Sequence, residues 1–224
     1  MFANRPTDVS KPIKITLIGD GSTGKSSYYN KLISLDNPEY RFNKKYKATD
    51  NFNVKKLNIP TNIGDINIFL WDTAGQEKYG GDLRDAYIKG SDGMIILYDV
   101  CDRNSINNLP KWISDTSTMC NNIPIAVCGN KVDRLENYDN LETIKMRQSK
   151  LRTMYSNGEI NGFLLSIKEN VNVVDDPGSL FKKVSVRRQN GVLTPLEYIL
   201  SRHYNKNVHI LDIEPKPNAD DNDF

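Results

Sequence analysis

The sequence has no long apolar segment and no strong excess of charge of either sign. Its 224 residues contain no run near the roughly 18 apolar residues that a membrane-spanning helix requires. The first residues, MFANRPTDVSKP, lack the apolar segment of a secretory signal. The 30 Lys and Arg residues nearly balance the 28 Asp and Glu residues, and the mean hydropathy is −0.56. We therefore expect a soluble protein that does not bind nucleic acid directly, because that binding requires a basic surface.

Cysteine is also scarce, and the cysteine positions argue against a cysteine metal site and against a C-terminal lipid. The three cysteines, Cys101, Cys120 and Cys128, lack the spacing of metal ligands and are odd in number. We expect reduced thiols of a cytosolic or nuclear protein, placed in or near the core as small apolar side chains. No cysteine follows Cys128, so no C-terminal cysteine can carry a prenyl group, and we expect no membrane anchor.

Short apolar runs alternate with segments of helical periodicity along the chain. A chain of this length can bury one sizeable core without disulfides. The predicted strands are residues 13–18, 52–59, 65–71, 93–98, 123–128 and 160–165, and the predicted helices are residues 25–35, 105–119, 141–155 and 195–204. Because strands and helices alternate, we predict an α/β fold: a six-stranded, mostly parallel sheet with helices on both faces.

The first predicted strand leads directly into a glycine-rich motif. Gly19-Asp-Gly-Ser-Thr-Gly-Lys-Ser26 fits the pattern G-x-x-x-x-G-K-[ST]. Glycines let successive backbone N–H groups point at phosphate oxygens, and the following helix adds its positive dipole end. A glycine-rich turn without a ligand is the alternative, but the place between strand and helix favours phosphate binding. The predicted phosphate-binding residues are Gly19, Asp20, Gly21, Ser22, Thr23, Gly24, Lys25, Ser26 and Ser27, with the Ser26 hydroxyl also on Mg²⁺.

A second acidic element follows the third predicted strand. Asp72 stands where a Mg²⁺-linked carboxylate is expected, beside the phosphate loop. Gly75 can bring its N–H to a γ-phosphate, and Gln76 can orient a water molecule because its amide both donates and accepts. Thr49, in the loop before the second strand, is the expected second hydroxyl ligand of Mg²⁺. Helix capping by Asp72 alone would not account for the three residue types together.

A third group of residues fits recognition of a guanine base. Asp133, after the fifth strand, can accept from two N–H groups of guanine that adenine lacks as a pair. Asn130 would brace the loop, and the stem of Lys131 would lie along the ring. Further predicted base contacts come from Phe42 by stacking and from the segment Ser166, Ile167 and Lys168 through backbone N–H groups.

These motifs together resemble the Ras-like small GTPase superfamily, over about residues 12–211. Within it the sequence is most similar to the Ran branch, the nuclear transport GTPases, in four stretches: residues 19–26, 44–49, 71–81 and 122–133. The resemblance implies a P-loop GTPase G domain that binds GTP or GDP with Mg²⁺. It implies metal ligands Ser26, Thr49 and Asp72, and catalytic roles for Gln76, Lys25 and Thr49.

The resemblance also implies partners and a location. Ran-like proteins hydrolyse GTP slowly unless stimulated, and work with a guanine-nucleotide exchange factor, a GTPase-activating protein and karyopherin-type transport receptors. We therefore expect a monomer that occurs in the nucleus and the cytoplasm.

Several segments depart from the Ran pattern. Asp50 and Asn51 follow the switch threonine in place of an apolar residue and glycine, and Ile167 replaces the usual alanine. We expect a flexible arm at residues 1–11, longer stretches near 134–160 and 169–193, and a short acidic tail at 212–224. Three alternatives stay open: an ATP-dependent P-loop kinase or ATPase, a Rab-like trafficking GTPase, and a Ran mimic that binds transport factors with little catalysis.

Overall fold

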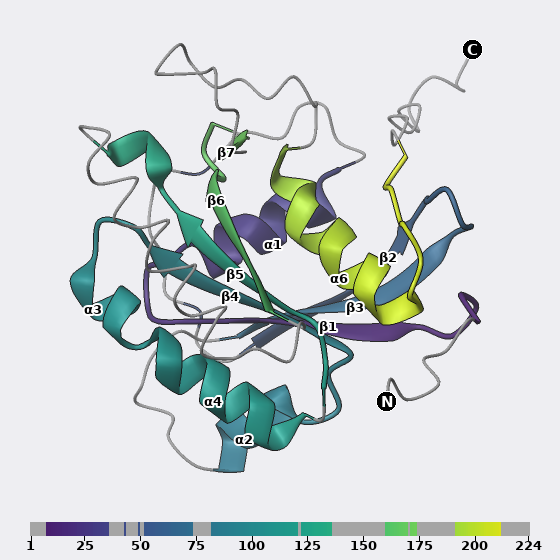
Figure 1. The fold of residues 1–224 in the computed structure, drawn as a ribbon, viewed down its shortest axis with the longest axis horizontal. Helices are drawn as coiled ribbons and strands as arrows, with labels where there is room; N and C mark the ends of the chain where they lie inside the picture. The colour runs from purple at the N-terminus through teal and green to yellow at the C-terminus, as the bar shows by residue number, and fades with distance from the viewer. Residues whose placement is uncertain are drawn as a thin grey trace, which may run out of the picture.

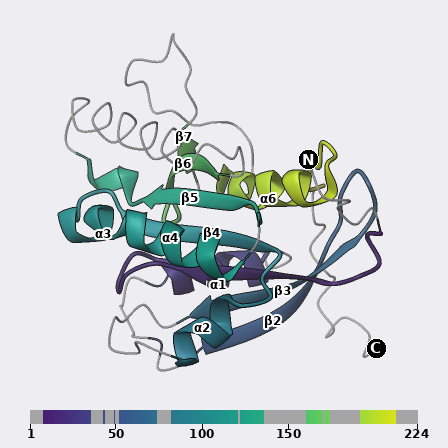
Figure 2. The same ribbon diagram turned by 60° about the horizontal axis from the view of Figure 1, so that its bottom comes forward.

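The chain folds around one seven-stranded sheet in the order β2-β3-β1-β4-β5-β6-β7. The computed structural model describes residues 8–35, 43, 49, 52–73, 82–120, 122–135, 160–169, 171–173 and 191–211. The strands are β1 (Ile13–Ile18), β2 (Phe52–Ile59), β3 (Ile66–Thr73), β4 (Gly93–Asp99), β5 (Ile125–Asn130), β6 (Ile160–Ser166) and β7 (Val171–Val173). Figure 2 shows the sheet across its width, from β2 at the bottom to β7 at the top.

Helices cover both faces of the sheet (Figure 1). The helical elements are α1 (Lys25–Ile33), α2 (Asp82–Ile88), α3 (Arg103–Asn107), α4 (Leu109–Met119) and α6 (Thr194–Tyr204), with single 3₁₀ turns η1 (Val132–Arg134) and η2 (Gly191–Leu193). In Figure 1, α1 and α6 lie above the sheet, whereas α2 and α4 lie below it. Among the described residues, none of these helices is both long and apolar enough to cross a membrane.

The two faces of the sheet bury separate apolar cores. Side chains alternate along a strand, so Ile95 and Leu97 of β4 belong to the core under α1 and α6. Met94 and Ile96 of the same strand belong to the core under α2 and α4. Every residue of β4 is buried, as expected for a central strand covered on both faces. The predicted α/β fold is confirmed.

The structure differs from the predicted elements at several places. Val171–Val173 adds a seventh, antiparallel strand beside β6, in a stretch where we predicted no element. β5 begins at Ile125 because Pro124, which precedes it, has no N–H for the ladder. The helix predicted at 105–119 is divided into α3 and α4, and Pro110 lies in the first turn of α4. The helix predicted at 141–155 lies outside the described residues.

Tyr28 connects α1 to η2 across the core. Its side chain is fully buried, and its hydroxyl donates a hydrogen bond to the carbonyl oxygen of Val192 at 2.7 Å. Burial raises the pKa of the Tyr28 hydroxyl far above its usual value, so the group stays protonated and remains a donor. The contact fixes the helix that begins at the phosphate loop against a segment 164 residues away.

We predict that Tyr28→Phe lowers the free energy of unfolding by about 1–3 kcal/mol, because the Val192 carbonyl is left buried without its donor. Urea unfolding of the two proteins measures the difference. Tyr87→Phe, at a partly exposed position of α2, is the control and should change stability by less than about 0.5 kcal/mol. Equal losses in both variants would contradict the assigned contact.

Candidate functional site

The predicted site residues follow the carboxyl ends of neighbouring parallel strands. β1 pairs in parallel with β3 and β4, β4 with β5, and β5 with β6. The ends of these strands therefore meet at one edge of the sheet, where ligands of open α/β sheets bind. The glycine-rich loop follows β1, and Asp72 lies near the end of β3. Asn130 ends β5, and Ser166 ends β6.

The loop between β1 and α1 requires glycine at two positions. Gly19 and Gly24 have φ angles of +132° and +103°, a region that side-chain-bearing residues rarely adopt. A Cβ at Gly19 would collide with the carbonyl oxygen of Leu97, and one at Gly24 would collide with the Asn130 side chain. The loop is therefore packed against β4 on one side and the end of β5 on the other.

Lys25 lies under this loop as a buried cation. Its ammonium group donates to the carbonyl oxygens of Gly19 at 2.9 Å and Asp20 at 2.7 Å, and the residue is 5 % exposed. Burial lowers the pKa of Lys25 to about 8, while the negative charges of Asp72 and Asp20 act in the opposite direction. An anion bound above the loop would stabilise the charged ammonium, as expected for a phosphate-binding lysine.

Asp72 is fully buried beside two hydroxyl groups. The hydroxyls of Ser26 and Thr49 lie 2.8 Å apart and share a hydrogen bond, so the structure brings these two predicted ligands together. Neither carboxylate oxygen of Asp72 has a well-formed hydrogen bond to any described residue. Burial raises the pKa of Asp72, and the nearby Ser26 hydroxyl and Lys25 charge oppose that shift.

This arrangement fits a hard divalent cation. A buried carboxylate without a well-formed hydrogen bond is costly, and a cation would compensate it. Mg²⁺ takes oxygen ligands and is usually held by one or two carboxylates together with phosphates and water. Within the described ranges no cluster of three His, Cys, Asp or Glu side chains could hold a metal alone. The residues present therefore suit Mg²⁺ bound together with a phosphate, and Ser26, Thr49 and Asp72 would be its protein ligands.

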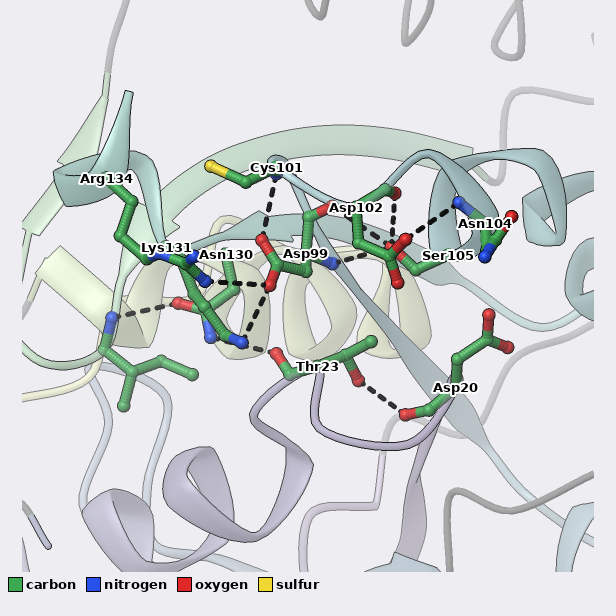
Figure 3. A network of polar contacts seen from close by, with 11 residues as sticks. Asp20, Thr23, Asp99, Cys101, Asp102, Asn104, Ser105, Asn130, Lys131 and Arg134 are labelled. Atoms are coloured by element: carbon green, nitrogen blue, oxygen red, sulfur yellow. Dashed lines mark hydrogen bonds and ion pairs between the residues drawn. The ribbon is translucent and has the colours of Figure 1, made fainter. Parts of the chain in front are cut away.

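Asn130 connects the phosphate loop to the segment after β6. Its side-chain amide donates to the carbonyl oxygen of Thr23 at 3.0 Å, a contact that Figure 3 shows as a dashed line. Its amide oxygen accepts from the backbone N–H of Ile167 at 3.2 Å. Asn130 is 4 % exposed, so both bonds are shielded from water. The predicted bracing role of Asn130 thus corresponds to two contacts in the structure.

Asp133 lies in η1, just after β5, and its carboxylate is already engaged. One oxygen accepts from the Ser166 hydroxyl at 2.6 Å, and the other lies 3.6 Å from the Lys168 ammonium. The Ser166 hydroxyl also accepts from the Glu169 N–H at 3.1 Å. Three of the residues predicted to contact the base are therefore close together, and Asp133 keeps partial exposure toward solvent.

Asp99, at the end of β4, is a site residue that the sequence analysis missed. Its carboxylate accepts from the Lys131 ammonium at 2.8 Å and lies 3.4 Å from the Arg134 guanidinium (Figure 3). Lys131 itself has a left-handed backbone with φ of +68°. The ion pair fixes the Lys131 side chain beside the loop that holds Asp133. In the sequence, Asp99 could have been identified as an acidic residue at the end of an apolar strand.

Asp20 has a role that differs from its neighbours in the loop. Its carboxylate contacts Asn108 and Trp112 at the beginning of α4, a pairing that the sequence analysis did not foresee. Gly21, Ser22 and Thr23 complete the loop, and Ser27 lies in the first turn of α1. The remaining predicted residues, Phe42, Gly75 and Gln76, lie outside the described residues.

A comparison with protein families agrees with this geometry. A sequence model described as the Ras family matches residues 14–186, which is more than half of the chain. The matched segment contains the glycine-rich loop, Asp72, Asn130 and Asp133, and the segment after β6.

We predict that Asn130→Ala lowers the free energy of unfolding by about 1–3 kcal/mol even without any ligand. The Thr23 carbonyl and the Ile167 N–H would both remain buried without partners. Urea unfolding of the ligand-free protein measures this loss. Asn58→Ala, on the exposed face of β2, is the matched control and should stay within about 0.5 kcal/mol of the original protein. A loss no larger than that of the control would show that the amide is not a structural brace.

Proposed function

The chain belongs to the Ras family. From that membership, together with the resemblance of four stretches to the Ran branch, we propose that it is a GTP-hydrolysing switch of the Ran type. Ras-family proteins are small GTPases that bind guanine nucleotide with Mg²⁺ and work with exchange factors and activating proteins. Membership therefore makes this protein a small GTPase. The observation that carries the assignment of its site is the buried carboxylate of Asp72, which lies beside the Ser26 and Thr49 hydroxyls without a well-formed hydrogen bond to a described residue.

The phosphate side of the site follows from this observation. Lys25 would exchange its two backbone carbonyl partners for the β- and γ-phosphates, and would neutralise charge that develops during phosphoryl transfer. Ser26, Thr49 and Asp72 would hold Mg²⁺, which would supply positive charge to offset that of the phosphates. Gln76 would orient the attacking water in line with the bond that breaks. Lys25, Thr49 and Gln76 are thus the proposed catalytic residues.

The base side of the site would give a preference for guanine. Asp133 would accept from the two adjacent N–H groups of guanine, and its carboxylate is already oriented by the Ser166 hydroxyl. Lys131, fixed by Asp99, would place its aliphatic stem along the ring. Adenine offers no such donor pair to Asp133. A guanine-selective site disfavours the alternative of an ATP-dependent P-loop kinase or ATPase.

The bound nucleotide would decide which surface this protein presents to its partners. The γ-phosphate would contact Thr49 and Gly75, and hydrolysis removes those contacts, so residues 38–50 and 74–90 would present different surfaces in the two states. Intrinsic hydrolysis in such switches is slow, on the order of 10⁻⁴ per second, and an activating protein accelerates it by about 10⁵-fold. We propose that this protein behaves in the same way.

The Ran-type role rests on sequence resemblance. The stretches 19–26, 44–49, 71–81 and 122–133 support it, and they imply karyopherin-type receptors as partners in the nucleus and cytoplasm. A Rab-like trafficking role is the alternative within the same family. Asp50 and Asn51, which depart from the Ran pattern beside the switch threonine, favour a second candidate: a Ran mimic that binds transport factors with little catalysis.

We predict that Gln76→Leu slows single-turnover hydrolysis of GTP at least about tenfold, while GTP binding is retained, because only the positioning of water is lost. Hydrolysis by the original protein should require Mg²⁺. Phosphate release from preloaded protein, with and without a chelator, measures both effects. Equal rates for the two proteins, without Mg²⁺ dependence, would favour the mimic.

We also predict that transport receptors bind the GTP form in preference to the GDP form. Gln76→Leu loaded with GTP serves as bait, the original protein loaded with GDP is compared with it, and Asp133→Ala controls for loss of nucleotide. Captured proteins are identified by mass spectrometry. Trafficking effectors in place of transport receptors would favour the Rab-like alternative, and equal capture in both nucleotide states would argue against a switch.

A further inference from the structure

The glycine-rich loop, which would bind negatively charged phosphates, itself contains an acidic residue, Asp20. Asp20 stands directly after Gly19, between the end of β1 and the backbone N–H groups of the loop. An ionised carboxylate turned toward the phosphates would repel them, and such repulsion is strong where water is scarce. In the structure, the Asp20 side chain points toward α4.

Both carboxylate oxygens of Asp20 are held by donors at the beginning of α4. The indole Nε1–H of Trp112 donates to Oδ1 at 2.7 Å, and the amide Nδ2–H of Asn108 donates to Oδ2 at 2.8 Å. Asn108 immediately precedes α4, and Trp112 lies in its first turns. Hydrogen bonds to an ionised acceptor are about twice as strong as those between neutral groups, so two short ones define the carboxylate orientation.

The donors are suited to a fixed contact. Trp112 is 9 % exposed and packs in the core under α4, so its ring cannot turn freely. Its indole N–H can only donate, never accept. The Asn108 side chain makes no capping hydrogen bond to α4 and instead reaches the loop. These two side chains therefore form a rigid anchor that is provided by a different part of the chain.

The backbone of Asp20 faces the opposite way. Its carbonyl oxygen accepts from the Lys25 ammonium at 2.7 Å and from the Thr23 hydroxyl at 2.9 Å. Asp20 thus directs its carbonyl into the loop, toward the phosphate-binding lysine, and its carboxylate outward to α4. Figure 3 shows the carbonyl of Asp20 joined to Thr23 while its carboxylate points away from that contact.

We propose that Trp112 and Asn108 are positioning residues for nucleotide binding: they hold the Asp20 carboxylate away from the bound phosphates. This inference rests on the proposed function, because it requires a phosphate-bearing ligand in the loop. Without the anchor, the Asp20 side chain is free to turn toward the phosphates, where its charge weakens binding. The anchor is needed only while residue 20 is charged.

That last condition makes the proposal testable by a double-mutant cycle. The measured quantity is the dissociation rate of fluorescently labelled GDP in the presence of Mg²⁺. Trp112→Phe removes the indole donor and should accelerate release about tenfold, the effect expected from losing one hydrogen bond to a charged group. Asp20→Asn is the other single variant of the cycle, and its own release rate is the reference for the double variant. The double variant should release GDP within about twofold of Asp20→Asn alone, because no charge remains to be held away.

Two further variants separate this role from packing. Asn108→Ala removes the other donor without touching the core, should accelerate release in the same direction, and should likewise be suppressed by Asp20→Asn. Ile113→Val removes one methyl group from the same fully buried helix face, and should lower the melting temperature without accelerating release. If Trp112→Phe fails to fold, the Asn108→Ala pair carries the test.

The outcomes are distinct. Unchanged release in the Trp112 and Asn108 variants overturns the anchor, and so does fast release that persists in the double variants, because a packing effect would not depend on the charge of Asp20. If the original protein binds no GDP at all, the proposed function fails together with the inference. Suppression by Asp20→Asn, with normal GDP binding by the original protein, supports both.

Discussion

The hydrogen bonds of the Asn130 side chain connect the two halves of the site. One amide group spans the carbonyl of Thr23 and the N–H of Ile167, so the phosphate loop after β1 and the loop after β6 have a fixed relative position. The same side chain leaves no room for a Cβ at Gly24. The distance between these two loops is therefore fixed before a ligand binds its phosphates to one and its base to the other. Strands cannot shift within a packed parallel sheet without breaking the hydrogen bonds between them.

The site also contains opposite charges that are only partly compensated within the protein. Lys25 is buried under the loop with a pKa lowered to about 8, and Asp72 is buried with a raised pKa. Each charge is costly in isolation and becomes favourable when a counter-ion of the right sign arrives. Phosphate above Lys25 and Mg²⁺ beside Asp72 would satisfy both at once. Asp20 is the exception, since its carboxylate accepts hydrogen bonds from uncharged donors at the beginning of α4.

Local patterns predicted most of the fold, and their failures have physical causes. Alternating apolar residues and a glycine-rich motif located β1 and α1 correctly, since both depend on residues near in sequence. The short strand Val171–Val173 was missed because three residues carry too little periodicity, and it exists only through its pairing with β6. Pro110 divided a predicted helix because it removes an N–H and begins a new first turn.

The sequence alone determined which chemical groups follow each strand, because order along the chain and strand polarity place them at one edge of the sheet. Ser26, Asp72 and Asp133 could be assigned in this way. Only the tertiary structure decided how those groups are held. Asp20 meets Trp112 across 92 residues, and Asn130 meets Thr23 across 107 residues. Contacts over such separations leave no local pattern, since they arise from packing α4 and β5 against the phosphate loop.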